Sequence, residues 1–252
     1  MAFGPQPTPR RHHLPAPGLP AWPLALLAGV LPCCAALLAW WLSTRSGLIP
    51  ACNVFLEGCV SVSRAARHEL PNHLFRALML PSAALQALVW LLAHHWLRQL
   101  DVAGRGLGWI VPLGVMAAVA LVLYGTFLGT EGDIYRWLRR YGTVVYFGFT
   151  CLCLLLAGSG IQRAVHAGSL VLPRWQEHAM VTLAVTLVLL GLVNAIVAAT
   201  LSPETKHAVE NITEWWGALI FVLGFLSLAL MWQRTGVRVQ LTLGAAGPRA
   251  SG

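Results

Sequence analysis

Hydrophobic and polar residues are separated into long blocks along this chain. Apolar runs of about 20 residues alternate with shorter polar stretches, and a helix needs about that length to cross the hydrocarbon core of a bilayer. The strands of a membrane β-barrel would instead show short segments in which apolar and polar residues alternate. The pattern predicts six membrane-spanning helices, at residues 21–42, 74–97, 107–129, 141–161, 179–200 and 215–232.

The fold class that follows is an all-α, polytopic integral membrane protein. We expect one six-helix membrane domain, residues 21–233, between two tails. Residues 1–20 are rich in proline and basic side chains, so they cannot bury a core and are expected to be disordered. Residues 234–252 are expected to form a flexible C-terminal tail.

Three predicted spans contain a proline, namely Pro32, Pro81 and Pro112. Proline removes one backbone donor and leaves a carbonyl oxygen of the preceding turn without its usual partner. Membrane helices tolerate this where neighbouring groups bind the freed carbonyl. We therefore expect these prolines to bend the helices without ending them.

The composition supports the membrane assignment. Only 10% of the 252 residues are charged and 57% are hydrophobic, whereas about 25% of residues in soluble domains are charged. The 17 basic residues outnumber the nine acids, but they flank the apolar runs and do not mark one solvated face. Contact with lipid headgroups explains this placement better than nucleic-acid binding, so we expect no nucleic-acid partner.

An even number of spans places both termini on the same side of the membrane. The basic residues divide almost evenly between the two sides, but seven of the nine acids fall on the side opposite the termini. We expect cytoplasmic termini, and the arginine-, alanine- and leucine-rich composition favours a bacterial inner membrane. The opposite, outer face then carries Glu57, Glu69, Glu131, Asp133, Glu204, Glu210 and Glu214.

The longest loop, residues 43–73, carries a candidate lipid-headgroup site. Arg64 and Arg67 have helical spacing, which predicts a short interfacial helix that ends at Leu70-Pro71. Arg76 follows in the next span. Guanidinium groups match phosphate oxygens in pairs, so these three arginines are candidates for binding a lipid phosphate.

The same loop leaves two structural alternatives open. The three arginines could instead pair with Glu57 and Glu69 within a folded loop. Cys52 and Cys59 could form a disulfide if the loop lies in an oxidising compartment, or they could remain two free thiols.

The approach to the last span is the second polar segment of interest. Glu210 and Glu214 are four residues apart and share one helix face. They could stabilise the positive end of the helix dipole, or they could reach the first loop or a bound headgroup. In the second case Glu57, Glu69, Glu210, Asn211, Glu214 and Trp215 would form a polar network over the outer face.

Enzymatic motifs are absent from the sequence. No nucleophile elbow, Walker loop or nucleotide-binding glycine string occurs, so we expect no catalytic residue, metal or cofactor. A metal-dependent lipid hydrolase or transferase using His68, His73 and His207 with the outer acids is the alternative. A passive channel or transporter comes third, because no ionisable residue lies at the centre of a span.

The sequence resembles the Frag/DRAM/Sfk family, also described as CWH-like N-terminal-domain proteins. The resemblance covers about residues 20–235 and rests on Ser63–Arg67, on Leu74-Phe75-Arg76, and on Asn211–Trp216. A Glu-Trp pair that opens the final helix recurs in that family, and Glu214-Trp215 stands at this place. The Asp-Thr-Gly core of the DRAM branch is absent, so no activity specific to that branch carries over.

The family resemblance implies a role with membrane lipids, since eukaryotic members are associated with lipid remodelling, lipid asymmetry and lysosomal membranes. We therefore expect a lipid-associated, non-enzymatic protein that organises or supports the membrane or envelope. Its expected partners are membrane lipids and another membrane protein.

Overall fold

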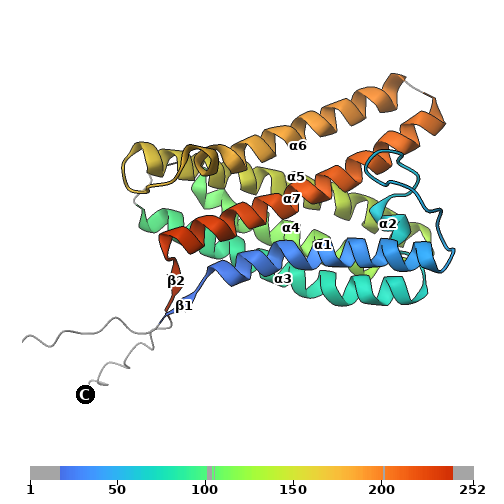
Figure 1. Ribbon diagram of the computed structural model, residues 1–252, viewed down its shortest axis with the longest axis horizontal. Helices are drawn as coiled ribbons and strands as arrows, with labels where there is room; N and C mark the ends of the chain where they lie inside the picture. The colour runs from blue at the N-terminus through green and yellow to red at the C-terminus, as the bar shows by residue number, and fades with distance from the viewer. Residues whose placement is uncertain (1–17, 101–103, 105, 201, 241–252) are drawn as a thin grey trace, which may run out of the picture.

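The computed structural model describes residues 18–100, 104, 106–200 and 202–240, and within them it is an all-α polytopic membrane protein (Figure 1). Six helices are long and apolar enough to cross a membrane, which confirms the predicted fold class. They are α1 (Trp22–Arg45), α3 (Glu69–Gln99), α4 (Ile110–Thr126, preceded by the 3-10 turn Leu107–Trp109), α5 (Asp133–His166), α6 (Arg174–Thr200) and α7 (Pro203–Thr235).

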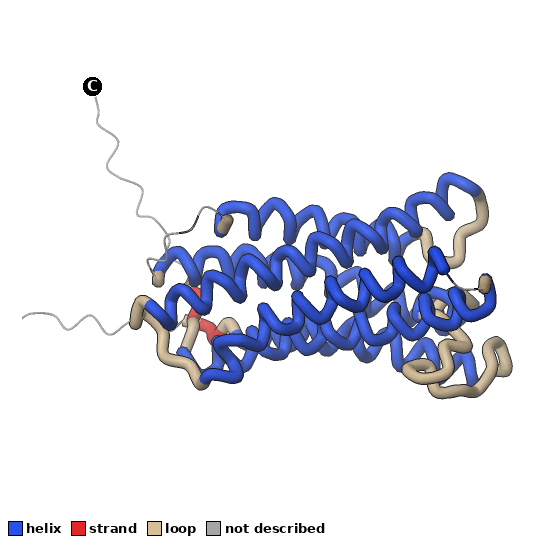
Figure 2. Tube along the Cα trace, turned by 90° about the horizontal axis from the view of Figure 1, so that it is seen from above, coloured by secondary structure: helices blue, strands red, loops and turns tan. Residues whose placement is uncertain are grey.

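The six long helices form an elongated bundle, seen from two directions in Figures 1 and 2. Each long helix packs against the next one in the sequence, and α1 packs against α7 to close the ring. Helix α6 packs mainly against α5 and α7, and its exposed apolar side chains, such as Val188 and Leu192, face outward as lipid-facing residues do.

Two helices begin before the apolar runs that were predicted as spans. Helix α5 begins at Asp133 and α7 begins at Pro203, several residues before the apolar runs that start at residues 141 and 215. Hydropathy marks the part of a helix that sits in lipid, whereas the backbone hydrogen bonds continue through polar residues at its end. Each of these helices has more residues than a span requires, so its first turns project beyond the apolar region.

The first and last described segments of the chain meet at one end of the bundle. Strand β1 (Leu19–Pro20) pairs in antiparallel fashion with β2 (Arg238–Val239), so the last residues of the expected N-terminal tail form a strand. The remaining tail predictions, for residues 1–17 and 241–252, lie outside the described residues. We call the opposite end of the bundle the cap end. It contains the short helix α2 (Val62–Ala65) and the first turns of α5 and α7.

The prediction that Leu70-Pro71 ends the short helix was wrong. Helix α2 ends at Ala65, and Pro71 lies in the first turn of α3. The first amide groups of a helix have no carbonyl partner within it, so a proline costs little there. Pro112 likewise lies in the first turn of α4.

Pro32 lies inside α1, and a neighbouring helix binds the carbonyl group that it leaves free. In a regular helix the amide of residue 32 would donate to the carbonyl oxygen of Ala28, but proline has no N–H. Instead, Gln86 Nε2 donates to Ala28 O over 3.2 Å and Ser82 Oγ donates to it over 3.4 Å. Both donors come from α3, so the proline in α1 leads to hydrogen bonds between α1 and α3. We call these two hydrogen bonds the polar joint.

This joint predicts a coupled mutational effect. Gln86→Leu removes a donor from a buried carbonyl, so we expect it to lower the free energy of unfolding by about 1–2 kcal/mol. Pro32→Ala restores the amide that donates within α1. In that background Gln86→Leu should therefore lower the free energy of unfolding by clearly less. Unfolding by SDS titration of the four proteins in the double-mutant cycle measures this coupling. Equal costs of Gln86→Leu in both backgrounds would contradict the proposed joint.

Candidate functional site

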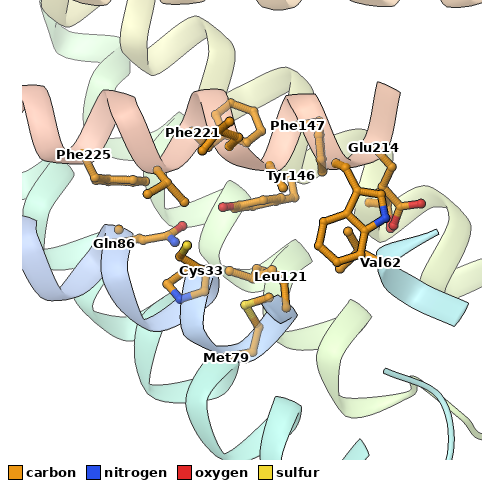
Figure 3. A pocket seen from close by; sticks show the side chains of 18 of the residues that line it. Cys33, Val62, Met79, Gln86, Leu121, Tyr146, Phe147, Glu214, Phe221 and Phe225 are labelled. Atoms are coloured by element: carbon orange, nitrogen blue, oxygen red, sulfur yellow. The ribbon is translucent and has the colours of Figure 1, made fainter. Parts of the chain in front are cut away.

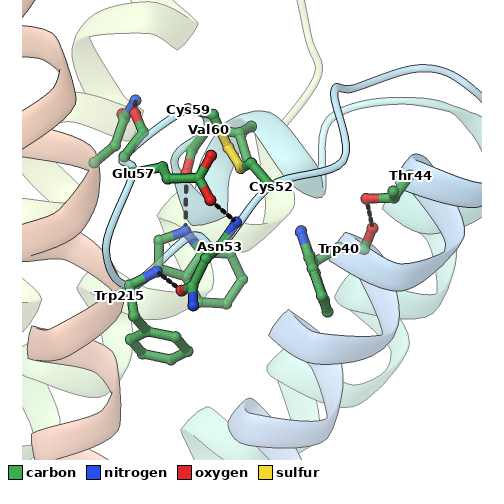
Figure 4. Close-up of a disulfide and its surroundings, with 11 residues drawn as sticks. Trp40, Thr44, Cys52, Asn53, Glu57, Cys59, Val60 and Trp215 are labelled. Atoms are coloured by element: carbon green, nitrogen blue, oxygen red, sulfur yellow. Dashed lines mark hydrogen bonds between the residues drawn. A yellow bond between two sulfur atoms is a disulfide. The ribbon is translucent and has the colours of Figure 1, made fainter.

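The loop between α1 and α3 folds over the cap end; we call residues 46–68 the cap loop. A disulfide between Cys52 and Cys59 closes its first part (Figure 4). Within this ring the backbone N–H of Asn53 donates to Glu57 Oε1 over 2.9 Å, and the N–H of Phe55 donates to Asn53 Oδ1 over 3.1 Å. The carboxylate of Glu57 therefore stabilises the loop itself.

The cap loop is bound to the first half of α7 through backbone carbonyl groups. Asn211 Nδ2 donates to Gly58 O over 2.7 Å, Trp215 Nε1 to Val60 O over 2.9 Å and Trp216 Nε1 to Phe55 O over 3.1 Å. The ring of Phe55 makes edge contacts with both tryptophan rings. These three polar side chains of α7 hold the loop through neutral hydrogen bonds.

Helix α2 is attached to several other segments. Ser61 Oγ accepts from the N–H of Arg64 and begins the helix, while Ser43 Oγ of α1 donates to Ala65 O over 2.6 Å. Buried Asn72 of α3 donates to Ala66 O just after α2 and to Leu128 O after α4. These contacts fix the position of α2 against the bundle.

An apolar cavity of about 210 Å³ lies between the helices beneath this loop. Figure 3 shows Gln86 and Phe225 at its deep end and Glu214 at the end toward the cap. Its walls come from α1, α3, α4, α5 and α7, with Phe55 of the cap loop and Val62 of α2 closing it. Apolar side chains dominate the lining, including Met79, Leu121, Phe147, Leu219, Phe221 and Val222.

A second cavity, of about 360 Å³, adjoins the first one at the cap end. Three residues line both cavities, namely Tyr124, Thr143 and Glu214. The rest of the second lining is Ser63, Val144 and four arginines: Arg67, Arg136, Arg139 and Arg140. The apolar cavity and the basic one therefore adjoin at these three residues.

The arginines of the second cavity differ in how they are held. Arg139 donates through Nη1 to the carbonyl oxygens of Phe127, over 2.9 Å, and of Thr130. Arg136 lies 3.6 Å from Asp133 on the exposed surface of α5. Within the described ranges, Arg67 and Arg140 form no ion pair and no side-chain hydrogen bond. These two guanidinium groups are thus available to an anion.

Glu214 is the acidic residue of this lining. Its Oε1 accepts a hydrogen bond from the backbone N–H of Ser63 over 3.2 Å, which joins α7 to α2. Its side chain lines both cavities, so it lies where the apolar and basic parts meet.

Of the three predicted headgroup arginines, one lines the basic cavity. Arg67 lines the basic cavity, but Arg64 and Arg76 do not. In the part of the chain that the structure describes, none of the three forms an ion pair with Glu57 or Glu69. The described part of the structure therefore contains none of the ion pairs that the alternative of a folded, ion-paired loop requires.

The predicted polar network forms only in part. Asn211, Glu214 and Trp215 bind the cap loop, as described above. Glu210 instead lies 3.8 Å from Lys206 and 3.4 Å from His207 on the surface of α7. Glu69 is exposed and begins α3, where its carbonyl oxygen lies 2.8 Å from Nδ1 of His73.

The sequence interpretation missed Arg136, Arg139 and Arg140 as site residues. Their segment lies between the predicted spans 107–129 and 141–161, so the sequence interpretation gave their spacing no role in a cavity. Helical spacing was the available signal, because residues three or four apart lie on the same side of a helix. Tyr124 and Thr143 were missed because nothing in the sequence distinguishes them from other residues of apolar runs.

The histidines proposed for a metal-dependent hydrolase do not gather into a ligand set. Among the described residues, no group of three or more His, Cys, Asp or Glu side chains is placed to hold a metal ion. His207 lies beside Glu210 on α7, and His73 contacts the backbone of α3. The geometry therefore gives this alternative no specific support.

Comparisons of the chain with protein-family models, with curated proteins and with solved structures find no match. The functional interpretation therefore rests on the two cavities and the residues around them.

Proposed function

We propose that this protein is a lipid-associated, non-enzymatic membrane protein that holds a lipid chain in its apolar cavity. The observation that carries the proposal is the apolar cavity itself, which is lined by five helices and covered at one end by the cap loop. An apolar cavity of roughly 150 Å³ stays dry and admits benzene in an engineered protein. The larger cavity here, about 210 Å³, suits an apolar occupant, and a bilayer supplies acyl chains.

The surroundings of the cavity favour a binding role over transport. A polar path would be required for an ion or a polar solute, yet apolar side chains dominate the chamber between the helices. A lipid held there would tie the protein to its membrane and would support the organisation of the envelope around it. The resemblance to Frag/DRAM/Sfk proteins, which are associated with membrane lipids, is in keeping with this role.

The proposed location is a bacterial inner membrane with cytoplasmic termini. Strands β1 and β2, which come from the two ends of the described part of the chain, lie at the end of the bundle opposite the cap loop. The cap end then faces the exterior, which is the oxidising side and suits the disulfide between Cys52 and Cys59.

Filling the cavity tests the proposal. Ala218 of α7 lines the chamber, so Ala218→Phe should occupy it and reduce the lipid that co-purifies with the protein to a small fraction of the wild-type amount. Ala195→Phe is the matched control, because it adds the same side chain on the exposed face of α6. Mass spectrometry of extracted lipid, per mole of protein washed in a neutral maltoside detergent, gives the measurement.

A milder variant separates filling from misfolding. Ala218→Leu adds less volume and should give an intermediate loss of lipid, while gel filtration checks that each variant remains monodisperse. Wild-type levels of lipid in a folded Ala218→Phe protein would rule out the chamber as the binding site. Absence of stoichiometric lipid from the wild type, even after incubation with added phospholipid, would overturn the proposed function.

A further inference from the structure

We propose that the arginine-lined cavity binds the phosphate headgroup of an anionic lipid whose acyl chain lies in the apolar cavity. This inference rests on the proposed function, because it places the chain in the same chamber. It extends that function by naming the class of ligand and the residues that select it.

The first support is that the two cavities adjoin. Tyr124, Thr143 and Glu214 line both of them, so a ligand that passes between these side chains would occupy both. The change from apolar to basic lining occurs across these three residues. A ligand that matches both parts is an amphiphile with a hydrocarbon tail and a negatively charged head.

The second support is the charge of the lining. Four arginines and one carboxylate face the basic cavity, which leaves it positively charged. Arg67 and Arg140 have no ion-pair partner among the described residues, and Arg139 uses only Nη1 in its hydrogen bonds to carbonyl groups. Guanidinium groups present several N–H donors in a plane that matches phosphate oxygens.

The third support is how these arginines are positioned. Arg139 is held by the carbonyl groups at the end of α4, so its guanidinium group is oriented before a ligand arrives. Arg67 follows α2, whose position is fixed by Ser43 and Asn72. A guanidinium group that is held in advance, as that of Arg139 is, loses less conformational entropy when an anion binds.

Glu214 occupies the junction between the chambers. Its Oε1 is used by the N–H of Ser63, while its Oε2 has no hydrogen bond in the described structure. A carboxylate at this place can accept a hydrogen bond from a glycerol hydroxyl, which lies between the chain and the phosphate of a lysophospholipid. The carboxylate of Glu214 therefore suits the glycerol hydroxyl of such a lipid, and the arginines suit its phosphate.

Two lysolipids with the same oleoyl chain separate the headgroup from the tail. Delipidated protein in a maltoside detergent is titrated with oleoyl-lysophosphatidic acid or oleoyl-lysophosphatidylcholine, and binding is followed by native mass spectrometry. We expect the anionic lipid to bind about tenfold more tightly or better, since only its phosphate is exposed to the arginines without a neighbouring cation. Inorganic phosphate, present at the same concentrations, should displace neither lipid.

The arginine variants identify the residues responsible. Arg67→Gln combined with Arg140→Gln should bring the two affinities close together by weakening only the anionic lipid. Arg64→Gln combined with Arg76→Gln is the matched control, because it removes the same charge near the same end of the bundle but outside the cavity lining. That control should keep the full preference.

The outcomes distinguish this inference from the proposed function. If the wild type binds both lysolipids equally, the headgroup inference fails while the chain-binding function stands. If it binds neither, the proposed function fails as well. If the control pair loses the preference as strongly as the cavity pair, general surface charge is responsible. If inorganic phosphate alone displaces the anionic lipid, the site takes a free anion and not a lipid headgroup.

Discussion

Replacing Gly58 by alanine should detach the cap loop from α7 and lower the free energy of unfolding by about 3 kcal/mol, the sum of an overpacking cost and a backbone cost. Gly58 has a φ of 64°, in the left-handed region that disfavours residues with a Cβ. A Cβ at this position would also overlap the carbonyl group of Ala208 in α7. The overlapping atoms of Ala208 belong to the backbone, so a change of side-chain rotamer cannot relieve the overlap and the loop itself must move.

Gly47 provides the matched control for this variant. Its φ is 68°, close to that of Gly58, but a Cβ there would meet no atom within 4 Å. Gly47→Ala should therefore cost only the backbone contribution, about 1 kcal/mol. The comparison of the two alanine variants isolates the contact between loop and helix.

Two measurements report the effect of Gly58→Ala. SDS titration gives the free energy of unfolding, and hydrogen–deuterium exchange of residues 53–66 shows whether the loop opens locally. Because Phe55 and Val62 close the apolar cavity, the variant should also retain less lipid than Gly47→Ala. Equal stability and equal exchange in the two variants would show that the loop does not depend on close contact with Ala208.

Replacing Gly114 by alanine should separate α3 from α4 and destabilise the protein by about 2–3 kcal/mol. A Cβ at Gly114 would lie 2.6 Å from Cβ and 2.7 Å from Cγ of Trp90. Trp90 is fully buried and packs against Phe225, so its side chain has little room to turn away. Its Cβ moves only with the backbone of α3.

Gly125 lies in the same helix and serves as the control. The nearest atom to a Cβ at Gly125 is Leu80 Cδ2, at 3.6 Å, which is an ordinary contact. Gly125→Ala should be neutral or stabilising by up to about 1 kcal/mol, because alanine favours helix more than glycine does. SDS titration of both variants tests the prediction. A Gly114→Ala protein as stable as Gly125→Ala would mean that the α3–α4 interface is looser than described.

The position of Pro32 illustrates what local sequence can and cannot predict. The sequence alone requires that the carbonyl of Ala28 lose its partner, since proline has no amide hydrogen. Which group replaces that partner depends on the crossing of α1 and α3, and Gln86 lies 58 positions further along the chain. The need for a donor was predictable, but its identity was not.

The candidate site shows the same division. The Glu214-Trp215 pair and Asn211 were recognised as polar residues at the start of a span, and each proves to bind the cap loop. The contact between Ser63 and Glu214 joins residues 151 positions apart. No periodicity in the sequence reports such a pairing, because it depends on how the ring of helices closes.

The amino-acid sequence by itself determined the six spans and the all-α class, because a bilayer admits only long apolar segments whose backbone groups are bonded internally. Tertiary structure alone decided that Arg67 lines one cavity together with Arg139 and Arg140, while Arg64 and Arg76 do not line it. The physical reason is that lipid acts on each segment separately, through its own hydrophobicity. A cavity exists only between segments, where the packing of several helices leaves a volume unfilled.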